Sequence, residues 1–393
     1  MNVTAHRRAH EGELVAYDVP PGPHWSEILE AHADSGASFL PLDARLSPRE
    51  KRTLVGRAHP TLLVTADEEV VFPHEVQIDP ARAWAVVATS GTGGESHLAD
   101  LPRASLGAAV AGSLDALGIE PGEPWICVLT PAHVGGLLVL LRGVLGGAPV
   151  AVHERFDVER VIGEAYGAHV AIVPTMLHRL VVADADLSRL GVLLVGGGAL
   201  DPGLLDRARA LGGRVVSTYG LTESCGGVVY DGVPFDGVEV RLAFEGAIEL
   251  RGPTLMDGYR DEPQATAAAF STDGWLRTGD VGSLDDEVLT VRGRADDAIR
   301  SGAETVWPDE VESVLRTHPE VADVAVAGRP DLEWGQRVEA WVVPADPGFP
   351  PSLQALRDHC REQLAGFKAP RAVHVVDGLP RTGGGKLRRS ALP

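Results

Sequence analysis

Residues 170–217 have the sequence VAIVPTMLHRLVVADADLSRLGVLLVGGGALDPGLLDRARALGGRVVS. Three apolar runs in this stretch, Val170–Val173, Val192–Val195 and Val215–Ser217, are typical of buried strands. The two segments between them each begin with a proline-containing turn and continue in a helical pattern. Strands that alternate with helices in this way predict parallel βαβ units with right-handed crossovers, and therefore an α/β fold.

Segments on the N-terminal side extend the same pattern. Apolar runs at Ala83–Thr89, Trp125–Leu129 and Val150–His153 are expected to form further buried strands, and Val158–Tyr166 has a helical pattern. The longest apolar run, residues 134–150, contains an arginine and several glycines. We therefore expect a buried element there and not a membrane span.

The pattern changes at about residue 235 and again after Arg294. Short strands separated by Gly and Asp come first and predict a small β-rich subdomain. The residues that follow combine helices at 308–317 and 353–364 with strands between and after them, which indicates a compact α+β domain. We therefore expect an N-terminal domain over residues 1–295 and a C-terminal α+β lid domain over residues 296–393.

Composition excludes some classes of protein. A net charge of −20 over 393 residues argues against a nucleic-acid-binding protein, because these usually have a basic surface. Cys127, Cys225 and Cys360 are far apart and odd in number, so neither a disulfide framework nor a metal site is expected. Residues 1–20 contain no apolar stretch of the kind found in signal peptides. The cytoplasm is the expected compartment.

Lysine is almost absent from the chain. Only three of the 35 Lys and Arg residues are lysines, namely Lys51, Lys368 and Lys386. Lysine is a compact charge on a flexible stem, whereas arginine is a planar fork. A lysine retained in such a chain is a candidate for chemistry that arginine cannot perform, although an exposed lysine can also occur there by chance.

Two segments rich in glycine and hydroxyl groups each follow a predicted strand. The first is Thr89-Ser90-Gly91-Thr92-Gly93-Gly94-Glu95-Ser96-His97, whose N–H and hydroxyl groups could bind phosphate, although it lacks the Walker A pattern. The second is Tyr219-Gly220-Leu221-Thr222-Glu223-Ser224, whose carboxylate could bind Mg²⁺. Taken alone, the first is more often a plain turn, and the second is as often a helix start.

Two further motifs lie nearer the C-terminus. Gly274-Trp275-Leu276-Arg277-Thr278-Gly279-Asp280 ends in a carboxylate that could accept two ribose hydroxyls, although an Asp after Gly is ordinarily a turn residue. Arg381-Thr382-Gly383-Gly384-Gly385-Lys386 places one of the three lysines on a glycine-rich tether. Such a tether suits a mobile cation, and it also suits a frayed tail.

In this order the four motifs resemble those of the ANL superfamily, which comprises acyl-CoA synthetases, nonribosomal-peptide adenylation domains and luciferases. They resemble its T-S-G-T-T-G-x-P-K loop, its Y-G-x-T-E and T-G-D motifs and its C-terminal Gly-Lys. Residues 293–297 (GRADD) resemble the G-R-x-D-D hinge, and residues 301–310 (SGAETVWPDE) resemble the segment that follows it. The resemblance runs from about Ser38 to the end. It implies a large N-terminal domain of βαβ subdomains with a small β-rich subdomain, and a small mobile C-terminal domain.

The resemblance also implies roles for individual residues. Glu223 would bind Mg²⁺, Asp280 and Arg294 the ribose, and Asp296 would be the hinge. The catalytic residues would be Lys386, Glu223, Thr89 and His133, the last as the gate of the acyl pocket. The residues that would bind ATP are Thr89, Ser90, Gly91, Thr92, Gly93, Gly94, Gly197, Gly198, Tyr219, Gly220, Thr222, Asp280, Arg294 and Lys386.

The implied activity is that of an AMP-forming acid–thiol ligase that uses ATP, Mg²⁺ and coenzyme A. A carboxylate is a poor electrophile, so its attack on the α-phosphate of ATP installs AMP as a leaving group and expels pyrophosphate. Two anions approach each other in this step, and Mg²⁺ and Lys386 would offset their repulsion. A thiol would then take the acyl group after rotation of the C-terminal domain about the hinge.

Two features depart from the superfamily pattern. His97 stands where the phosphate loop usually has Lys, and Gly93 stands where it has Thr. These changes predict weaker neutralisation of phosphate charge, unless they reflect only the scarcity of lysine. Fewer residues precede Phe39 than is normal for the superfamily, so we expect a first subdomain that is shortened at its front.

The acyl substrate is suggested by a narrower resemblance. Residues 148–157 (APVAVHERFD) and 173–177 (VPTML) are similar to the acyl-pocket region of the o-succinylbenzoate–CoA ligases of menaquinone biosynthesis. Such a dicarboxylate needs a cationic or donor-rich pocket for its second carboxylate, and Arg142, His178 and Arg179 are candidates.

Two alternatives remain open. One is a stand-alone adenylating enzyme that loads another aryl or acyl acid onto coenzyme A or a carrier protein. The other is a degenerate, non-catalytic nucleotide-binding protein. The expected partners are a small carboxylic acid and coenzyme A, without nucleic acid or membrane, and assembly as a homodimer is left open.

Overall fold

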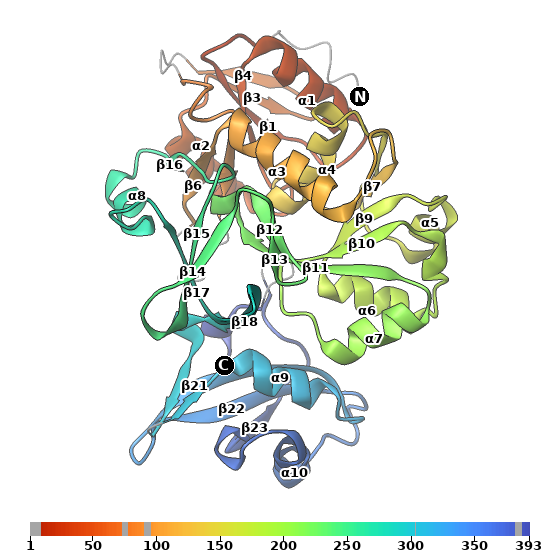
Figure 1. The fold of residues 1–393 in the computed structure, drawn as a ribbon, viewed down its shortest axis with the longest axis vertical. Helices are drawn as coiled ribbons and strands as arrows, with labels where there is room; N and C mark the ends of the chain where they lie inside the picture. The colour runs from red at the N-terminus through yellow and green to blue at the C-terminus, as the bar shows by residue number, and fades with distance from the viewer. Residues whose placement is uncertain (1–8, 73–77, 90–95, 303, 382–386) are drawn as a thin grey trace. The chain divides into compact units, whose positions relative to one another are not determined.

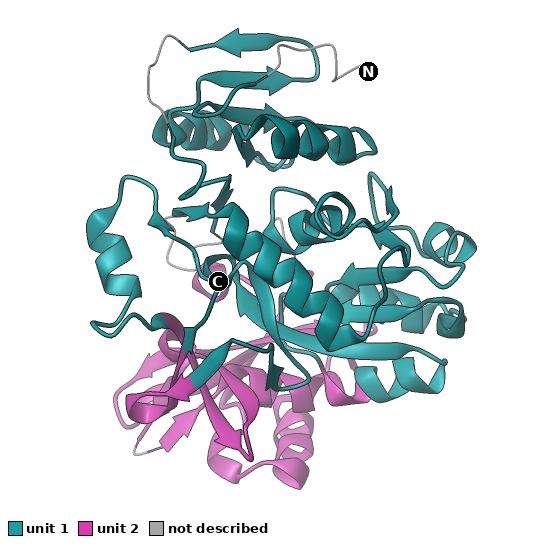
Figure 2. Cartoon of the chain, turned by 45° about the horizontal axis from the view of Figure 1, so that its top comes forward, with its two compact units in different colours: residues 1–200, 204–240, 250–276 teal, residues 201–203, 241–249, 277–393 magenta. Residues whose placement is uncertain are grey.

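The computed structural model describes residues 9–72, 78–89, 96–302, 304–381 and 387–393. Within these ranges the chain forms two compact units. Unit 1 comprises residues 1–200, 204–240 and 250–276, and unit 2 comprises residues 201–203, 241–249 and 277–393 (Figure 2). The units interleave along the chain, and the domain boundary between residues 295 and 296 stays a prediction.

The first sheet of unit 1 is mixed and has seven strands in the order β16-β6-β5-β2-β1-β3-β4 (Figure 1). Strand β1 pairs in parallel with both β2 and β3, whereas β5 is antiparallel to β6. Helices α1 (His24–Ser35) and α2 (Pro48–Ala58) belong to the same part of the chain. The strands are β1 (Leu14–Asp18), β2 (Ser38–Pro41), β3 (Leu62–Thr65), β4 (Glu69–Val71), β5 (Ala85–Ala88), β6 (Leu98–Leu101) and β16 (Gly258–Tyr259).

The second sheet of unit 1 confirms the predicted parallel βαβ pattern. Its order is β13-β12-β11-β10-β9-β7-β8, and the pairs β8–β7, β7–β9, β9–β10 and β10–β11 are all parallel. Strands β12 and β13 continue it in antiparallel fashion. The strands are β7 (Trp125–Cys127), β8 (Val150–Val152), β9 (His169–Ile172), β10 (Val192–Val195), β11 (Arg214–Leu221), β12 (Gly226–Tyr230) and β13 (Val233–Pro234).

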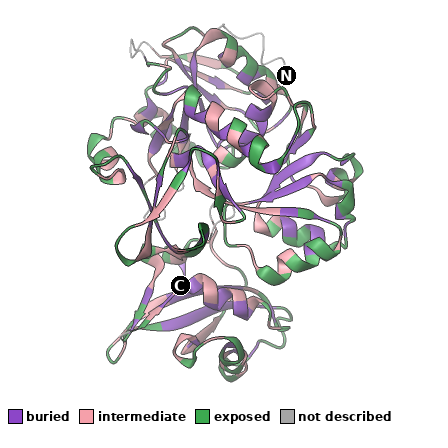
Figure 3. Cartoon of the chain, in the orientation of Figure 1, coloured by how far each residue is buried: buried purple, intermediate pink, exposed green. Residues whose placement is uncertain are grey.

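Helices cover both faces of this second sheet, which explains its continuous apolar strands. Helices α5 (Val158–Gly163), α6 (Pro174–Val182) and α7 (Pro202–Ala210) pack their apolar residues into one core with β9 and β10. Helices α3 (Arg103–Leu117) and α4 (Val134–Val144) contact β7, β9 and β12. Strands β7, β9 and β10 are therefore buried throughout, while α6 and α7 carry exposed residues (Figure 3).

The apolar run at residues 134–150 forms helix α4, a turn and the start of β8. Its central residues, from Gly136 to Arg142, are buried. This confirms the expected buried element. Within the described ranges, no helix is both long and apolar enough to cross a bilayer.

Two sheets contribute to the remainder of the chain. The first has the order β14-β15-β17-β18, and most of its residues belong to unit 2. The second has the order β20-β19-β22-β21, with β23 beside β22, and packs with α9 (Pro308–Arg316) and α10 (Leu353–Gln363) around an apolar core. The strands are β14 (Glu239–Leu242), β15 (Ala247–Arg251), β17 (Leu276–Asp285), β18 (Val288–Arg294), β19 (Ile299–Ser301), β20 (Glu304–Val306), β21 (Val321–Asp331), β22 (Gly335–Pro344) and β23 (Ala372–Val375).

A cluster of charges anchors the C-terminal end of the chain within unit 2. The Arg389 guanidinium donates to Asp297 at 3.1 Å, to Glu312 at 2.9 Å and to Asp309. Glu312 is only 2% exposed and also accepts the N–H of Val326 at 2.8 Å. Burial disfavours an ionised carboxylate, so Glu312 needs these partners to stay charged.

Arg389→Ala is expected to destabilise unit 2 by about 3–5 kcal/mol, because the buried Glu312 loses a charged partner. Urea unfolding followed by far-UV circular dichroism measures this loss. The neighbouring Arg388 is exposed, and Arg388→Ala is expected to change stability by about 0.5 kcal/mol or less. Equal effects of the two substitutions would contradict the assignment.

Helix α1 carries a buried histidine. His32 is 1% exposed, and its Nδ1 lies 2.9 Å from the carbonyl oxygen of Ala37 while Nε2 lies 2.8 Å from the hydroxyl of Tyr17. A carbonyl oxygen can only accept, so Nδ1 carries the proton and Nε2 accepts from Tyr17. Burial lowers the pKa of His32 to about 4, and the folded protein therefore holds this imidazole neutral at pH 7.

His32 is expected to make stability depend on pH. The unfolded state, with an ordinary His pKa of about 6.5, binds more protons than the folded state between about pH 4 and pH 6.5, so stability falls as pH drops through this window. The loss amounts to about 3 kcal/mol. Burial raises the pKa of Asp100 to about 6, which acts in the opposite direction.

The comparison is therefore made between the wild type and His32→Gln, which both retain Asp100. Relative to His32→Gln, the wild type should lose about 3 kcal/mol of unfolding free energy between pH 7 and pH 4. Urea unfolding at both pH values measures this loss. A difference independent of pH would show that His32 is not held neutral.

Candidate active site

The predicted phosphate loop begins directly after strand β5. The N–H of Thr89 donates to the carbonyl of His97 at 2.8 Å, and the Thr89 hydroxyl oxygen accepts the N–H of His97 at 3.0 Å. The Ser96 hydroxyl donates to the carbonyl of Thr89 at 2.6 Å. The two sides of the loop are therefore fastened together at its base. Ser90, Gly91, Thr92, Gly93 and Gly94 lie outside the described residues.

Glu223 lies in a short 3₁₀ turn, Thr222–Ser224, that follows β11. The Ser224 hydroxyl holds this turn, since it accepts the N–H of Leu221 and lies 2.9 Å from the carbonyl oxygen of Gly226. The Glu223 side chain is half-buried, and its Oε1 accepts the hydroxyl of Tyr259 at 2.7 Å. Among the described residues, Oε2 of Glu223 has no hydrogen-bond partner. One oxygen is thus oriented and the other stays available.

The structure also explains locally why glycine is needed at two of the predicted nucleotide-binding positions. A Cβ on Gly220 would lie 2.0 Å from the carbonyl oxygen of Gly226, so β11 and β12 approach too closely there for any side chain. Gly197, directly after β10, has a φ of 79°, which favours glycine. Tyr219 and Gly220 lie at a register shift at the end of β11, with Thr222 just beyond it, and Gly198 follows β10. The roles of these residues toward ATP stay predictions.

His133, the predicted acyl gate, lies immediately before helix α4 and contacts two charged residues. Its Nε2 is 3.4 Å from Oδ2 of Asp43 and 3.3 Å from the guanidinium of Arg45. Burial alone would raise the pKa of Asp43, but hydrogen bonds from His133 and Arg45 hold it well below its usual range. The Arg45 side chain is 51% exposed and pairs with Asp43 at 2.6 Å, so this ion pair lies beside the imidazole at the surface.

The predicted ribose-binding pair lies in unit 2. Asp280 and Arg294 are cross-strand neighbours on β17 and β18. Arg294 donates to the carbonyl of Thr278 at 2.8 Å and to Asp280 at 3.3 Å. Gly279, with a φ of 73°, lets the guanidinium pass close to the backbone, since a Cβ there would lie 2.8 Å from it. The two residues lie side by side, and their role toward the ribose stays a prediction.

Two further predictions concern the C-terminal part of the chain. Asp296 is exposed in a short turn after β18, and its role as the hinge stays a prediction. Lys386 lies outside the described residues. The residues that flank its segment are described: Arg381 pairs with Leu387 in an isolated β-bridge and forms an ion pair with Asp323 at 2.6 Å.

The three cationic candidates for a second carboxylate differ in burial. His178 and Arg179 are exposed on α6, and Arg179 packs against the ring of Phe156. Arg142 is 1% exposed, lies over the ring of Trp125 and donates to the hydroxyl of Ser113 at 2.7 Å. It forms no ion pair with a carboxylate in the part of the chain that the structure describes, and its Nε has no partner there. A buried cation of this kind is unusual.

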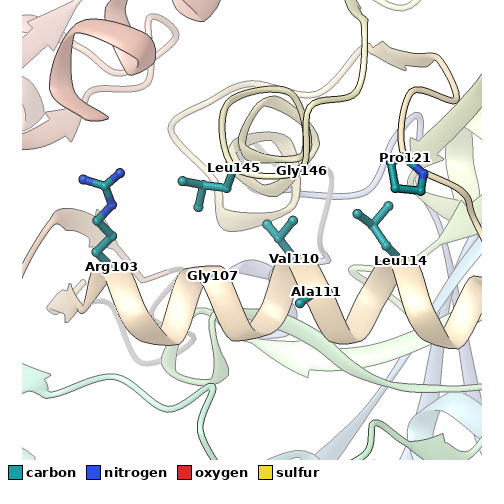
Figure 4. Close-up of a pocket in the computed structure, with 8 residues that line it drawn as sticks. All are labelled: Arg103, Gly107, Val110, Ala111, Leu114, Pro121, Leu145 and Gly146. Atoms are coloured by element: carbon teal, nitrogen blue, oxygen red, sulfur yellow. The ribbon is translucent and has the colours of Figure 1, made fainter. Parts of the chain in front are cut away.

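A surface groove of about 400 Å³ runs beside helix α3 (Figure 4). It is lined by Val110, Leu114, Leu145 and other mostly apolar residues, with Arg103 at one end. None of the predicted site residues that the structure describes lines it. The groove is therefore separate from the candidate active site.

Sequence analysis did not identify Arg57, Tyr259 and Glu262 as neighbours of the site. Glu262 accepts from Arg57 at 2.6 Å and contacts Nδ1 of His97 at 2.7 Å. Tyr259 stacks on His97 with ring centroids 4.6 Å apart. These pairs are separated by 162 to 205 residues along the chain, so no local pattern could have revealed them.

The donor chemistry at Glu223 fits a magnesium ion. Mg²⁺ commonly binds one or two protein carboxylates together with water and substrate phosphates. Glu223 offers one carboxylate oxygen that no described residue occupies. Among the described residues, no three His, Cys, Asp or Glu side chains cluster as a metal site, and a phosphate-bound Mg²⁺ needs no such cluster.

Two family descriptions match the chain. "AMP-binding enzyme" matches residues 72–260, and "AMP-binding enzyme C-terminal domain" matches residues 310–386. The chain is 42% identical to a Mycobacterium tuberculosis protein named "Probable 2-succinylbenzoate–CoA ligase", over 89% of this chain and 94% of that protein. It is 30% identical to the 2-succinylbenzoate–CoA ligase of Listeria innocua, over 93% of this chain and 85% of that protein.

Solved structures agree with these relatives. The chain superimposes on o-succinylbenzoate CoA synthetase from Bacillus subtilis, in complex with the acyl-adenylate intermediate, with a TM-score of 0.87 and 28% identity over 98% of this chain and 88% of that chain. The same enzyme in complex with ATP and a magnesium ion gives a TM-score of 0.87 and 28% identity over 98% and 90% of the two chains. The ANL-type α/β fold expected from the sequence is confirmed.

Proposed function

Because this chain belongs to the AMP-binding enzyme family, we propose that it is an ATP-dependent ligase that joins 2-succinylbenzoate to coenzyme A through an acyl-AMP intermediate. The observation that carries the proposal is the 42% identity to a 2-succinylbenzoate–CoA ligase relative along nearly the whole length of both chains. The fold match to an enzyme solved with its acyl-adenylate supports the same reaction.

The reaction has two steps. A carboxylate oxygen of the acid attacks the α-phosphorus of ATP, the bond from that phosphorus to the bridging oxygen breaks, and pyrophosphate leaves. The sulfur of coenzyme A then attacks the acyl carbonyl, the C–S bond forms, AMP leaves, and the thiol proton passes to solvent. Neither step needs a protein nucleophile. The three buried cysteines are therefore structural.

The residues of the chain are assigned to groups of ATP by their motifs and chemistry. Thr89 and the loop after it bind phosphate, Asp280 and Arg294 bind the ribose, and Lys386 contacts the reacting carboxylate and the α-phosphate. Tyr219, Gly220, Thr222, Gly197 and Gly198 line the base and acyl side. Glu223 holds the magnesium ion, which when bound offsets the negative charge of the phosphates.

The substrate assignment is tested by a comparison of acids. The rate of coenzyme A thioester formation is measured with 2-succinylbenzoate, benzoate and a fatty acid, each at several concentrations. The proposal expects kcat/KM to be highest for 2-succinylbenzoate. Equal values for the three acids, or transfer only to a carrier protein, would overturn it.

Arg142 is the best-supported partner for the second carboxylate of 2-succinylbenzoate. Its guanidinium is buried and has no carboxylate partner among the described residues, with one N–H unused. A carboxylate from the substrate would supply the missing charge and acceptor. His178 and Arg179 are exposed, so water can solvate them without an anionic partner.

Arg142→Met keeps much of the volume of the side chain and removes its charge. We expect KM for 2-succinylbenzoate to rise by roughly 10–100-fold, since a hydrogen bond between charged groups contributes about 1.5–3 kcal/mol. The KM for ATP should stay unchanged, and Arg179→Met serves as the matched control. An unchanged KM for the acid in Arg142→Met, with the fold intact by circular dichroism, would remove Arg142 from the site.

Two expectations from the sequence also stay proposals. One is a cytoplasmic location, which the three reduced, buried cysteines suit. The other is assembly as a homodimer. Light scattering of the purified chain measures its mass in solution and tests the second expectation directly.

A further inference from the structure

His97 occupies the place where the related phosphate loops have a lysine, and its surroundings explain what it does there. The backbone of His97 closes the loop base with Thr89 through two hydrogen bonds, of 2.8 Å and 3.0 Å. These contacts fix the backbone from which the His97 side chain projects.

The His97 side chain belongs to a closed ring of contacts. Its Nδ1 lies 2.7 Å from Oε2 of Glu262, so this nitrogen donates to the carboxylate. The other oxygen of Glu262 accepts from Arg57 at 2.6 Å, and Arg57 also donates to the carbonyl of Ser96 at 2.6 Å. Arg57 and Glu262 balance each other in charge, and the Glu262 carboxylate orients the imidazole.

The imidazole in turn orients Tyr259. The two rings are stacked with centroids 4.6 Å apart and an interplanar angle of 28°. The backbone of Tyr259 is fixed by pairing between β16 and β6 and by a 2.8 Å hydrogen bond from its N–H to the Thr266 hydroxyl. The phenol hydroxyl then donates to Oε1 of Glu223 at 2.7 Å.

The network therefore runs from the base of the predicted phosphate loop to the predicted metal-binding carboxylate. Its last member, Glu223, is half-buried and keeps its second oxygen without a partner among the described residues. The second oxygen is therefore available to a ligand while the first is held by Tyr259. A lysine at position 97 could not form the stacked contact, because it is a point charge on a flexible stem.

We propose that His97 and Tyr259 are positioning residues that hold the Glu223 carboxylate in the orientation that binds Mg²⁺. This inference rests on the proposed function. At the position of the related lysine, His97 supplies a geometric constraint, and Tyr259 transmits that constraint to Glu223. Partners of this kind, one step removed from a metal, typically change metal affinity or activity by 10–100-fold when they are lost.

The test measures binding as well as catalysis. The non-hydrolysable ATP analogue with a methylene bridge between the α- and β-phosphorus is titrated by calorimetry at a series of Mg²⁺ concentrations, and AMP is titrated without Mg²⁺. In Tyr259→Phe we expect the half-saturating Mg²⁺ concentration to rise by about tenfold, with AMP binding unchanged. Unchanged Mg²⁺ dependence, or an equal loss of AMP binding, would overturn the proposal.

Two variants of His97 separate its contacts. His97→Phe keeps a ring against Tyr259 and loses the bond to Glu262, whereas His97→Gln keeps a donor for Glu262 and loses the ring. Both are expected to raise the Mg²⁺ requirement, with the larger effect for His97→Gln. The double variant His97→Gln with Tyr259→Phe should be no worse than Tyr259→Phe alone, because His97 acts on Glu223 through the Tyr259 hydroxyl. Additive effects would show that the two residues act separately.

Arg82→Ala is the matched control. Arg82 forms an exposed ion pair with Asp257, two residues from Tyr259, and contacts no member of the network. It should leave Mg²⁺ dependence unchanged. Failure of the proposed function has a different signature: the wild type would bind the analogue with Mg²⁺ but would not exchange pyrophosphate into ATP when 2-succinylbenzoate is added.

Discussion

Lys386→Ala is expected to lower the exchange of pyrophosphate into ATP that depends on 2-succinylbenzoate by roughly 10²–10³-fold, a loss typical of removing one group that stabilises developing charge. In this step an anionic carboxylate approaches the polyanionic ATP, and the ammonium group offsets their repulsion. The effect should appear in kcat, because the interaction is strongest where the two anions meet.

The other two lysines are natural controls. Lys51 forms an ion pair with Asp18, and Lys368 forms one with Glu310. Lys51→Ala and Lys368→Ala should exchange pyrophosphate at rates close to that of the wild type. The transfer step gives a second control: with acyl-AMP supplied ready-made, Lys386→Ala should form the coenzyme A thioester at a near-normal rate. A normal exchange rate in Lys386→Ala would contradict its assignment.

Glu223→Gln is expected to lower the same exchange by roughly 10²-fold, since a carboxamide is a much poorer ligand for Mg²⁺ than a carboxylate. The amide oxygen can still accept the hydroxyl of Tyr259, so the fold and the hydrogen bond are kept while the charge is lost. The half-saturating Mg²⁺ concentration should rise in parallel. Kinetics across a range of Mg²⁺ concentrations measure both quantities.

Glu239→Gln is the control for this substitution. Glu239 is 55% exposed and pairs with Arg251 on the surface of unit 1, so its loss should leave the Mg²⁺ dependence unchanged. If Glu223→Gln kept the Mg²⁺ requirement of the wild type, the metal would have to be held by other groups.

The second sheet of unit 1 could be predicted from the sequence because its strands are buried on both faces. Strands β9 and β10 are buried along their whole length, and helices flank them on each side. Such strands appear in a sequence as continuous apolar runs. The prolines at the starts of α6 and α7 marked the helices between them.

Of the first sheet, only β5 was predicted, from the apolar run Ala83–Thr89. Strand β1 lies between β2 and β3 and was missed, because its run of aliphatic residues, Leu14–Ala16, is only three residues long. Helix α3 also gave no clear signal, because several exposed positions on its outer face are alanines, such as Ala104, Ala111 and Ala116, while its buried face includes small residues such as Ala109 and Ser113. Without contrast between a polar and an apolar face, helical periodicity is weak.

The candidate site was predicted as motifs and not as contacts. Motifs proposed Glu223, Asp280 and Arg294 as site residues, because each is marked by its immediate neighbours in sequence, and their roles stay predictions. The network that joins His97 to Glu223 depends on Tyr259 and Glu262, which carry no motif and are brought there by the pairing of β16 with β6. Long-range pairing of this kind leaves no local pattern to read.

The most direct test of the central claim is a single-turnover experiment followed by mass spectrometry. Enzyme in excess is mixed with ATP, Mg²⁺ and 2-succinylbenzoate, and coenzyme A is withheld and then added. We expect the acyl-AMP of 2-succinylbenzoate to accumulate with release of pyrophosphate, and to be converted into the coenzyme A thioester and AMP once the thiol is present. No acyl-AMP before coenzyme A is added, or an acyl-AMP that coenzyme A leaves unchanged, would contradict the account.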